Sequence, residues 1–385
     1  MADDIMFDCK AHLPPDWREA TLLGRADFGD GPSPALVTDG VLFDMSRVAP
    51  TTSLLIEAGP VDAQAGREIG SLDTLRLSTR NGVAGPRLLS PIDFQCVKAA
   101  GVTFAVSAVE RVIEERARGD AGAALALRGR LEGRIGGSIR SVVPGSTEAA
   151  ALKAGLIEEG LWSQYLEVAI GPDAEVFTKA PVLSTIGWGG EIGVRSDSTW
   201  NNPEPEVVLL MAPDGRPVGA TLGNDVNLRD FEGRSALLLG KAKDNNASCS
   251  LGPFVRLFDG EFTIDDVRAA EVALTIEGED GYVLHGASSM REISRDPLEL
   301  VRQTMSEHHY PDGFALFLGT LFAPTQDRDE PGRGFTHKRG DLVTIASERL
   351  GVLVNRVTTS RDAAPWTDGI GATLRGLVRR GLVEA

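Results

Sequence analysis

The sequence predicts a β-rich α+β protein, and two observations carry this prediction. From Leu166 onward, short runs of apolar and β-branched residues alternate with turn residues, which is typical of strands. The chain also holds 44 glycines and 21 prolines among its 385 residues, and these residues favour turns between short elements. With 42% hydrophobic residues, a chain of this length can bury a sizeable core without disulfide bonds.

The first 90 residues are typical of a smaller N-terminal domain with mixed α/β structure. Residues 35–46 (ALVTDGVLFDMS) contain two apolar runs around Asp39-Gly40, a pattern that predicts a β-hairpin. Prolines at both ends of residues 86–91 indicate a boundary. We therefore expect two domains, residues 1–90 and residues 91–385.

Three helices are predicted after residues 99–106, which are expected to form a buried strand or the entry to one. The apolar residues of 107–120 recur at helical spacing, and two pairs of opposite charge at i,i+4 support the same helix. Further helices are expected over residues 122–134 and 147–158.

The remainder of the chain predicts strands interrupted by two helical stretches, residues 228–239 and 297–309. The expected strands are residues 176–181, 191–196, 204–211, 219–226, 254–259, 271–278, 281–286, 314–321, 341–348 and 352–357.

Composition and charge exclude several classes of function. A formal net charge of −16 argues against nucleic-acid binding, which needs clustered Lys and Arg. The first residues, MADDIMFDCKAHLPPDW, are acidic and broken by prolines, unlike a signal peptide, and no apolar run approaches about 18 residues. Three cysteines without a C-x-x-C pair indicate a reducing compartment. We therefore expect a cytoplasmic protein that binds neither nucleic acid nor membrane.

The sharpest local feature is Asn-Asn-Pro-Glu-Pro-Glu at residues 201–206. Side chains on a strand alternate between faces, so Glu204 and Glu206 are expected to point the same way. Two carboxylates on one face repel each other unless water solvates them or a cation bridges them. A hard divalent ion with oxygen ligands is one interpretation. A solvated face at a sheet edge, where prolines are tolerated, is the other.

A third carboxylate follows in the segment LGNDVNLRD. Asp225 has apolar neighbours in a predicted strand, and a buried carboxylate without a partner is costly. It would complete a set of three carboxylates with Glu204 and Glu206, although an Asp bound to turn backbone is an equally common arrangement.

Two further patterns hold candidate catalytic residues. Lys243, in KAKDNNASCSLGP, is a candidate base or a cation for an enolate, whereas Lys241 is expected on the surface. Ser107 and Glu110 open the predicted helix 107–120 with the spacing of a capping box, which is a sufficient structural reason for both residues.

In their order along the chain, these segments resemble the fumarylacetoacetate hydrolase family over roughly residues 95–360. The segments are VFTKAP, Glu204-Pro-Glu206, GNDVNLRD, AKDNNASCSLGP, SSMREISRD, LFLGTLFAP, KRGDLVTI and LGVLVNRV. The resemblance implies a mixed β-sandwich roll beside the smaller N-terminal domain. It also implies homodimers or homotetramers.

The resemblance further implies Mg²⁺ held by Glu204, Glu206 and Asp225, with Mn²⁺ as an alternative because hard oxygen sites accept both. The ligand implied is a small 2-oxo acid. Substrate oxygens would be bound by Lys179 and by the Gly319-Thr320 pair.

One position departs from the pattern of the hydrolytic members. They carry Gly-x-Asn-Tyr-x-x-His-x-x-Glu, in which the His–Glu pair activates water, and Ser107 stands at the histidine position here. A serine hydroxyl is a poor general base near pH 7. The glutamate of the motif is retained as Glu110.

This departure favours β-elimination over hydrolysis. The sequence is most similar to the family branch that dehydrates 2-keto-3-deoxy-pentonates (arabinonate or xylonate) to 2,5-dioxopentanoate in oxidative pentose catabolism. That similarity implies Lys243 as the base or enolate partner and Glu110, positioned by Ser107, as the acid for the leaving hydroxyl. The alternatives are a diketo-acid C–C hydrolase or oxaloacetate-type decarboxylase of the same family, a non-catalytic binding protein, and a metal-free domain.

Overall fold

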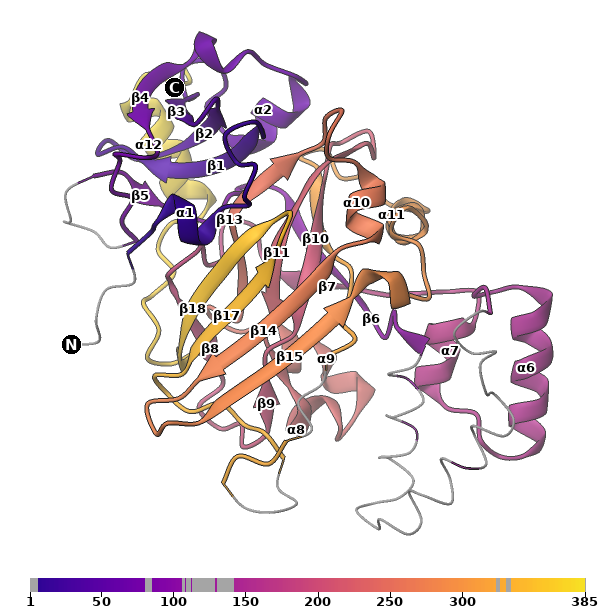
Figure 1. Ribbon diagram of the computed structural model, residues 1–385. Coiled ribbons are helices and arrows are strands. Elements are labelled where there is room, and N and C mark those ends of the chain that lie inside the picture. Colours follow the sequence, from indigo (N-terminus) through magenta and orange to yellow (C-terminus); the bar gives the residue numbers. More distant parts are fainter. Residues whose placement is uncertain are drawn as a thin grey trace.

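The computed structural model describes residues 6–79, 85–105, 108, 112, 129, 142–322, 326–329 and 334–384 (Figure 1). Two β-sheets face each other across one buried core, which contains Leu209 and Leu222 from the first sheet and Leu274 and Ile345 from the second. The predicted β-rich α+β class and the sandwich-like roll are both confirmed.

The first sheet has 11 strands in the order β4-β3-β2-β1-β13-β11-β10-β16-β6-β7, with β5 paired to β1. Its central strand β10 (Pro205–Met211) is buried along its whole length, as expected for the apolar run Val-Val-Leu-Leu-Met. The other strands are β1 (Leu22–Asp27), β2 (Pro32–Thr38), β3 (Val41–Asp44), β4 (Arg67–Ser71), β5 (Arg87–Leu88), β6 (Cys96–Gly101), β7 (Glu175–Ala180), β11 (Pro217–Asp225), β13 (Cys249–Leu257) and β16 (Phe314–Phe317).

The second sheet has five strands in the order β15-β14-β17-β18-β8. Buried and partly exposed residues alternate along β17, as expected for a strand with one face on the core. Its strands are β8 (Glu191–Val194), β14 (Glu271–Glu277), β15 (Val283–Ser289), β17 (Leu342–Ser347) and β18 (Gly351–Thr359), and a separate pair joins β9 (Asn201–Asn202) to β12 (Asn227–Leu228).

Helices are short and lie around the sheets (Figure 1). Those outside the N-terminal part are α6 (Thr147–Glu158), α7 (Gln164–Ile170), α8 (Arg229–Glu232), α9 (Leu239–Lys243), α10 (Ile264–Arg268), α11 (Pro297–Met305) and α12 (Ile370–Arg379), with 3₁₀ turns η2 (Ala236–Leu238) and η3 (Met290–Glu292). The N-terminal part holds α1 (Cys9–His12), α2 (Thr52–Glu57) and the 3₁₀ turn η1 (Ala63–Ala65).

The predicted hairpin at residues 35–46 is confirmed. Strands β2 and β3 pair antiparallel across Asp39-Gly40, and both turn residues have positive φ angles, of 49° and 72°. Such a turn matches the twist of the flanking strands, which explains the preference for Asp-Gly.

Other sequence predictions hold in part. The helix predicted at 147–158 coincides with α6, and α11 ends at Met305 rather than at residue 309. Of the strand, or entry to a strand, predicted at 99–106, residues 99–101 lie in β6, and the strand ends there because Val102 adopts a φ of 51° and turns the chain. The helices predicted at 107–120 and 122–134 lie almost entirely outside the described residues.

The sheet is continuous across the predicted boundary near residue 90. Strand β1 pairs with β13, so the N-terminal strands extend the sheet of the C-terminal part. Helix α12 lies beside these N-terminal strands (Figure 1), and Arg380 at its end donates to the carbonyl of Pro32 and the hydroxyl of Ser33. Within the described ranges, no helix has the length and apolar character needed to cross a bilayer.

Candidate active site

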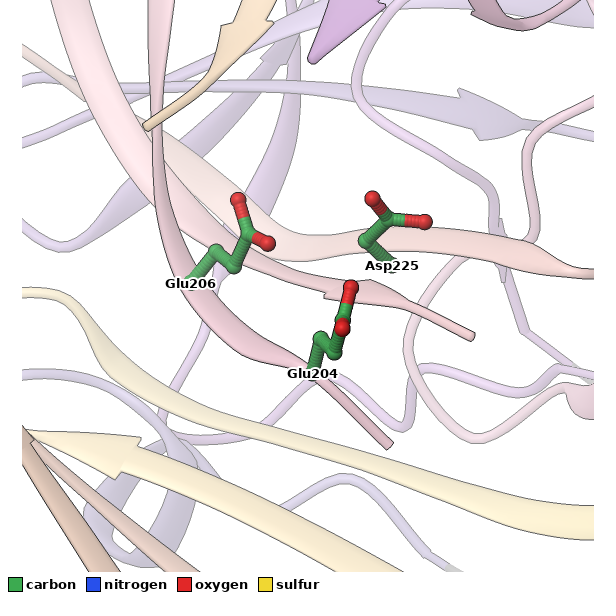
Figure 2. Close-up of side chains that lie close together, drawn as sticks. All are labelled: Glu204, Glu206 and Asp225. Atoms are coloured by element: carbon green, nitrogen blue, oxygen red, sulfur yellow. The ribbon is translucent and has the colours of Figure 1, made fainter. Parts of the chain in front are cut away.

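Three carboxylates converge where β10 begins and β11 ends. Glu204 directly precedes β10, Glu206 lies on it, and Asp225 is the last residue of the antiparallel neighbour β11. One oxygen from each lies within 4.8 Å of the others, and Figure 2 shows the three side chains turned toward one another. All three are buried, with Glu206 only 3% exposed. The structure thus brings together the residues singled out as metal ligands.

Two lysine ammonium groups contact this acidic cluster. Lys243, the last residue of α9, donates to Glu204 and to Asp225, the latter at 3.1 Å. Lys179, on β7, lies 2.8 Å from the other oxygen of Asp225 and donates to the carbonyls of Val226 and Lys243. Its side chain has no exposed surface. An ammonium has three donors, and Lys179 uses two of them on the carbonyls, while Asp225 Oδ1 contacts it as an ion pair without a hydrogen bond.

Burial and charge separate the pKa values of the cluster. Burial, followed by repulsion from Asp225 and Glu204, raises the pKa of Glu206 well above its usual range. Burial also acts to raise the pKa of Asp225, but Lys179 and Lys243 outweigh it and lower that pKa. Burial acts to lower the pKa of Lys243, and the carboxylates of Asp225 and Glu204 reverse this and raise it. Without a metal, Lys243 is therefore held as a cation.

Gly319 fixes the orientation of Glu206. Its backbone N–H donates to Glu206 Oε2 at 2.6 Å, in a chain segment where Gly319 has a φ of 89°. A Cβ atom at this position would lie 2.1 Å from Thr103 Oγ1. The sequence suggested that Gly319 binds substrate, whereas its described contact is with a candidate metal ligand.

We expect Gly319→Ala to destabilise the fold by about 1–3 kcal/mol beyond the matched control Gly281→Ala, because positive φ and a steric overlap coincide at Gly319. Gly281 has a φ of 81° with no atom within 4 Å of the position that an alanine methyl group would take, so it reports the backbone strain alone. Urea unfolding of both variants measures the difference. An equal loss of unfolding free energy in Gly319→Ala and Gly281→Ala would show that the overlap with Thr103 is relieved without cost.

The structure describes two more of the residues named from the sequence, Thr320 and Lys241. Thr320 is partly buried, and its hydroxyl accepts the N–H of Phe322, so its described contact is local. Lys241 is exposed, as expected. Ser107 and Glu110 lie outside the described residues, so their proposed roles rest on the sequence.

Sequence reasoning missed three asparagines beside the cluster. Within the described residues, Asn202 Oδ1, Asn224 Nδ2 and Asn227 Oδ1 are buried without a hydrogen-bond partner. Asn224 already orients the loop before β10 by accepting the N–H of Glu204 at 3.1 Å. Buried polar atoms are normally satisfied, so these amides need water or a ligand with several oxygens. These asparagines lie next to Glu204 and Asp225 in the sequence, and this proximity could have identified them as site residues.

The cluster fits a hard divalent cation. All three candidate ligands are carboxylates, which Mg²⁺ prefers, and their oxygens need only a small closing movement to share an octahedral ion with ligands at about 2.1 Å. Three ionised carboxylates against two ammonium groups would leave a formal charge of about −1, which a proton on Glu206 relieves in the absence of metal and which a bound cation would offset in its place.

Comparison with known proteins places this site in a family. A family model described as "Fumarylacetoacetate (FAA) hydrolase C-terminal" matches residues 161–358, which is just over half of the chain and includes all three carboxylates. The chain belongs to the fumarylacetoacetate hydrolase family. The resemblance noted from the sequence is thereby confirmed.

Two curated relatives carry related names. The chain is 34% identical over 202 residues to the "Probable 2-keto-3-deoxyxylonate dehydratase" of Haloferax volcanii, with 52% of this chain and 66% of that protein covered. It is 29% identical over 187 residues to the "2-dehydro-3-deoxy-D-arabinonate dehydratase" of Saccharolobus solfataricus, with 49% and 59% covered. The matches therefore span less than two thirds of either relative.

Solved structures share the fold of this family member. A 2-keto-3-deoxy-D-arabinonate dehydratase complexed with magnesium and 2,5-dioxopentanoate aligns with a TM-score of 0.59 at 21% identity, over 88% of this chain and 99% of that one. A fumarylacetoacetate hydrolase from psychrophilic Exiguobacterium antarcticum aligns with a TM-score of 0.55 at 16% identity, over 88% and 100% of the two chains. At these identities the likeness establishes the fold alone.

Proposed function

We propose that this protein is a magnesium-dependent hydro-lyase that converts 2-keto-3-deoxy-D-arabinonate or -xylonate to 2,5-dioxopentanoate in pentose catabolism. The observation that carries the proposal is the buried cluster of three carboxylates and two ammonium groups. The names of both curated relatives support the choice of substrate. Mn²⁺ is an alternative metal, and a homodimer or homotetramer is the proposed assembly.

The charge of the cluster favours an anionic 2-oxo acid as the ligand. The three carboxylates and the ammonium groups of Lys179 and Lys243 carry a formal charge of about −1 when all are ionised. A divalent cation changes this to about +1, and a monocarboxylate brings the buried site to neutrality. When bound, Mg²⁺ supplies Lewis-acid polarisation of the carboxylate and carbonyl oxygens of such an acid.

Lys243 is the residue best placed to act on the carbon next to the carbonyl. Its ammonium donates to two candidate ligands, so it lies within reach of the oxygens that they would hold. As a cation it stabilises the negative charge that develops on the substrate oxygen when the C3 proton leaves. For Lys243 to act as the base that removes the C3 proton, its ammonium group must first lose a proton.

Glu110 is the proposed acid that protonates the leaving C4 hydroxyl, with Ser107 positioning it. Loss of the C3 proton and of the C4 hydroxyl, which departs as water, leaves a C3=C4 double bond conjugated to the keto group. Removal of a proton from C5 and addition of one at C3 then give the C4=C5 enol, which tautomerises to the dioxo acid. We expect Glu110→Gln to lower dehydration by about a hundredfold or more while magnesium affinity stays unchanged, because the variant removes proton transfer only. Steady-state assays and calorimetry measure the two quantities, and full activity of the variant would exclude Glu110 from the mechanism.

The decisive assay incubates the metal-loaded protein with each enantiomer of 2-keto-3-deoxy-pentonate, coupled to a semialdehyde dehydrogenase. We expect magnesium-dependent formation of 2,5-dioxopentanoate. Release of pyruvate from a diketo acid instead would favour the hydrolase or decarboxylase alternative. That alternative is disfavoured because Ser107 stands at the position of the water-activating histidine. Absence of turnover with every one of these substrates would contradict the proposal.

Magnesium affinity is expected to rise with pH. The pKa of Glu206 is raised, so its carboxyl retains a proton above the usual range, and a metal that needs the carboxylate must displace that proton. The affinity should increase by up to about tenfold per pH unit until Glu206 is ionised and then level off. Calorimetry in two buffers of different ionisation enthalpy counts the protons released. Affinity independent of pH would show that Glu206 is not a ligand.

A further inference from the structure

A second cavity, with a volume of about 630 Å³, lies away from the three carboxylates, none of which lines it. Its walls come from β1 and β5, from the loop of residues 183–191 that leads into β8, and from residues 363–368 before α12. Stretches of chain that are distant in sequence therefore build one pocket, whose volume is typical of small-molecule sites.

Arg25, on β1, places a buried charge in the wall of this cavity. The residue is only 7% exposed, and the described part of the chain offers its guanidinium neither a hydrogen bond nor an ion pair within 4.0 Å. A guanidinium stays protonated in proteins, so it cannot escape burial by losing its charge. Buried charges are normally paired, and Arg25 is therefore short of an anion.

The acidic residues nearest to Arg25 do not fill this role. Asp93 accepts three backbone N–H groups, and Asp27 accepts two and pairs with Arg87. Asp368 attracts Arg25 without an ion pair and is exposed. The carboxylates around Arg25 are thus committed elsewhere or solvated.

The charged residues in the buried part of the cavity wall are arginines, of which Arg87 already pairs with Asp27. Arg87 and Arg356 are half-buried and line the cavity with Arg25, whereas the acidic lining residues Glu191 and Asp368 are exposed. The hydroxyl groups of Ser90 and Thr185 are hydrogen-bonded to each other at 2.7 Å, which leaves one neutral O–H donor in the lining. Trp366, 47% exposed, contributes an indole ring to the same lining.

We propose that this cavity binds a small oxyanion, a carboxylate or a phosphate, through Arg25. The planar guanidinium matches either group with two parallel hydrogen bonds. The site goes beyond the proposed function, since it shares no lining residue with the carboxylate cluster.

Calorimetric titration of the full, metal-stripped chain tests the proposal with two probes, inorganic phosphate and succinate, at constant ionic strength. We expect one of them to bind saturably with one site per chain, and the probe that binds identifies the class of ligand. Arg25→Met should weaken this binding by about tenfold or more, and Arg25→Lys should retain part of it. Arg361→Met, an exposed arginine outside the cavity lining, is the matched control and should bind as the wild type does.

A second measurement places the bound probe without relying on the folding of the Arg25 variants. Binding in the cavity, which Trp188 and Trp366 both line, should change the tryptophan emission of the wild-type protein with the calorimetric midpoint, and Trp366→Phe should reduce this change while still binding. Failure of both probes to bind saturably overturns the proposal, as does equal binding by Arg25→Met. Binding that leaves the emission of the wild-type protein unchanged would place the anion away from both tryptophans and also overturn it.

Discussion

Replacing Glu206 by glutamine is expected to abolish magnesium binding and to lower kcat/KM by about a thousandfold or more. The substitution leaves two of three carboxylate ligands and exchanges the third for an amide, which binds a hard cation poorly. The several kcal/mol that a Lewis acid contributes to a transition state correspond to a factor of this size. Metal titration and steady-state kinetics measure both effects.

The same variant separates loss of function from loss of fold. Glutamine matches the protonated form of Glu206, keeps an acceptor for the N–H of Gly319, and cannot take on the negative charge that Glu204 and Asp225 would repel. Metal-free Glu206→Gln should therefore unfold in urea at the wild-type midpoint or above it. Glu277→Gln, an exposed position on β14, serves as the control and should keep full activity. Metal-independent turnover by Glu206→Gln would contradict the site.

The three carboxylates could be predicted because their geometry is local. Residues two apart point to the same face of an extended chain, and Asp225 lies at the end of the adjoining strand of a hairpin-like pair. A short stretch of sequence thus determines which side chains meet. The residue pattern could also rank Lys243 as a candidate, since it lies on a helix that follows β11 closely along the chain.

Other features depend on contacts that no local pattern encodes. Gly319 follows β16, which pairs with β10, and it contacts Glu206 through its backbone N–H. Every non-proline residue has such an N–H, so the sequence does not mark this contact. Lys179 resembles a substrate-binding lysine in sequence, yet in the structure it pairs with Asp225 and donates to two carbonyls. The boundary at residue 90 remains a prediction, beside a sheet that runs across it through β1 and β13.

Removing the ammonium of Lys179 is expected to be the most destabilising single change in the site. Lys179→Met deprives Asp225 of one cation and leaves the carbonyls of Val226 and Lys243 without this donor, in a place with no exposed surface. Breaking a buried ion pair by deleting one partner typically costs about 3–5 kcal/mol. Urea unfolding with an unchanged m-value measures the loss.

Lys241→Met is the matched control, because Lys241 lies on the same short helix as Lys243 but is exposed, and it should change stability by less than about 1 kcal/mol. Magnesium should restore only part of the loss in Lys179→Met, since a cation can compensate Asp225 but cannot donate hydrogen bonds to carbonyl groups. Wild-type stability of Lys179→Met would show that Lys243 alone pairs Asp225. Lys179 would then be available to substrate, as the sequence suggested.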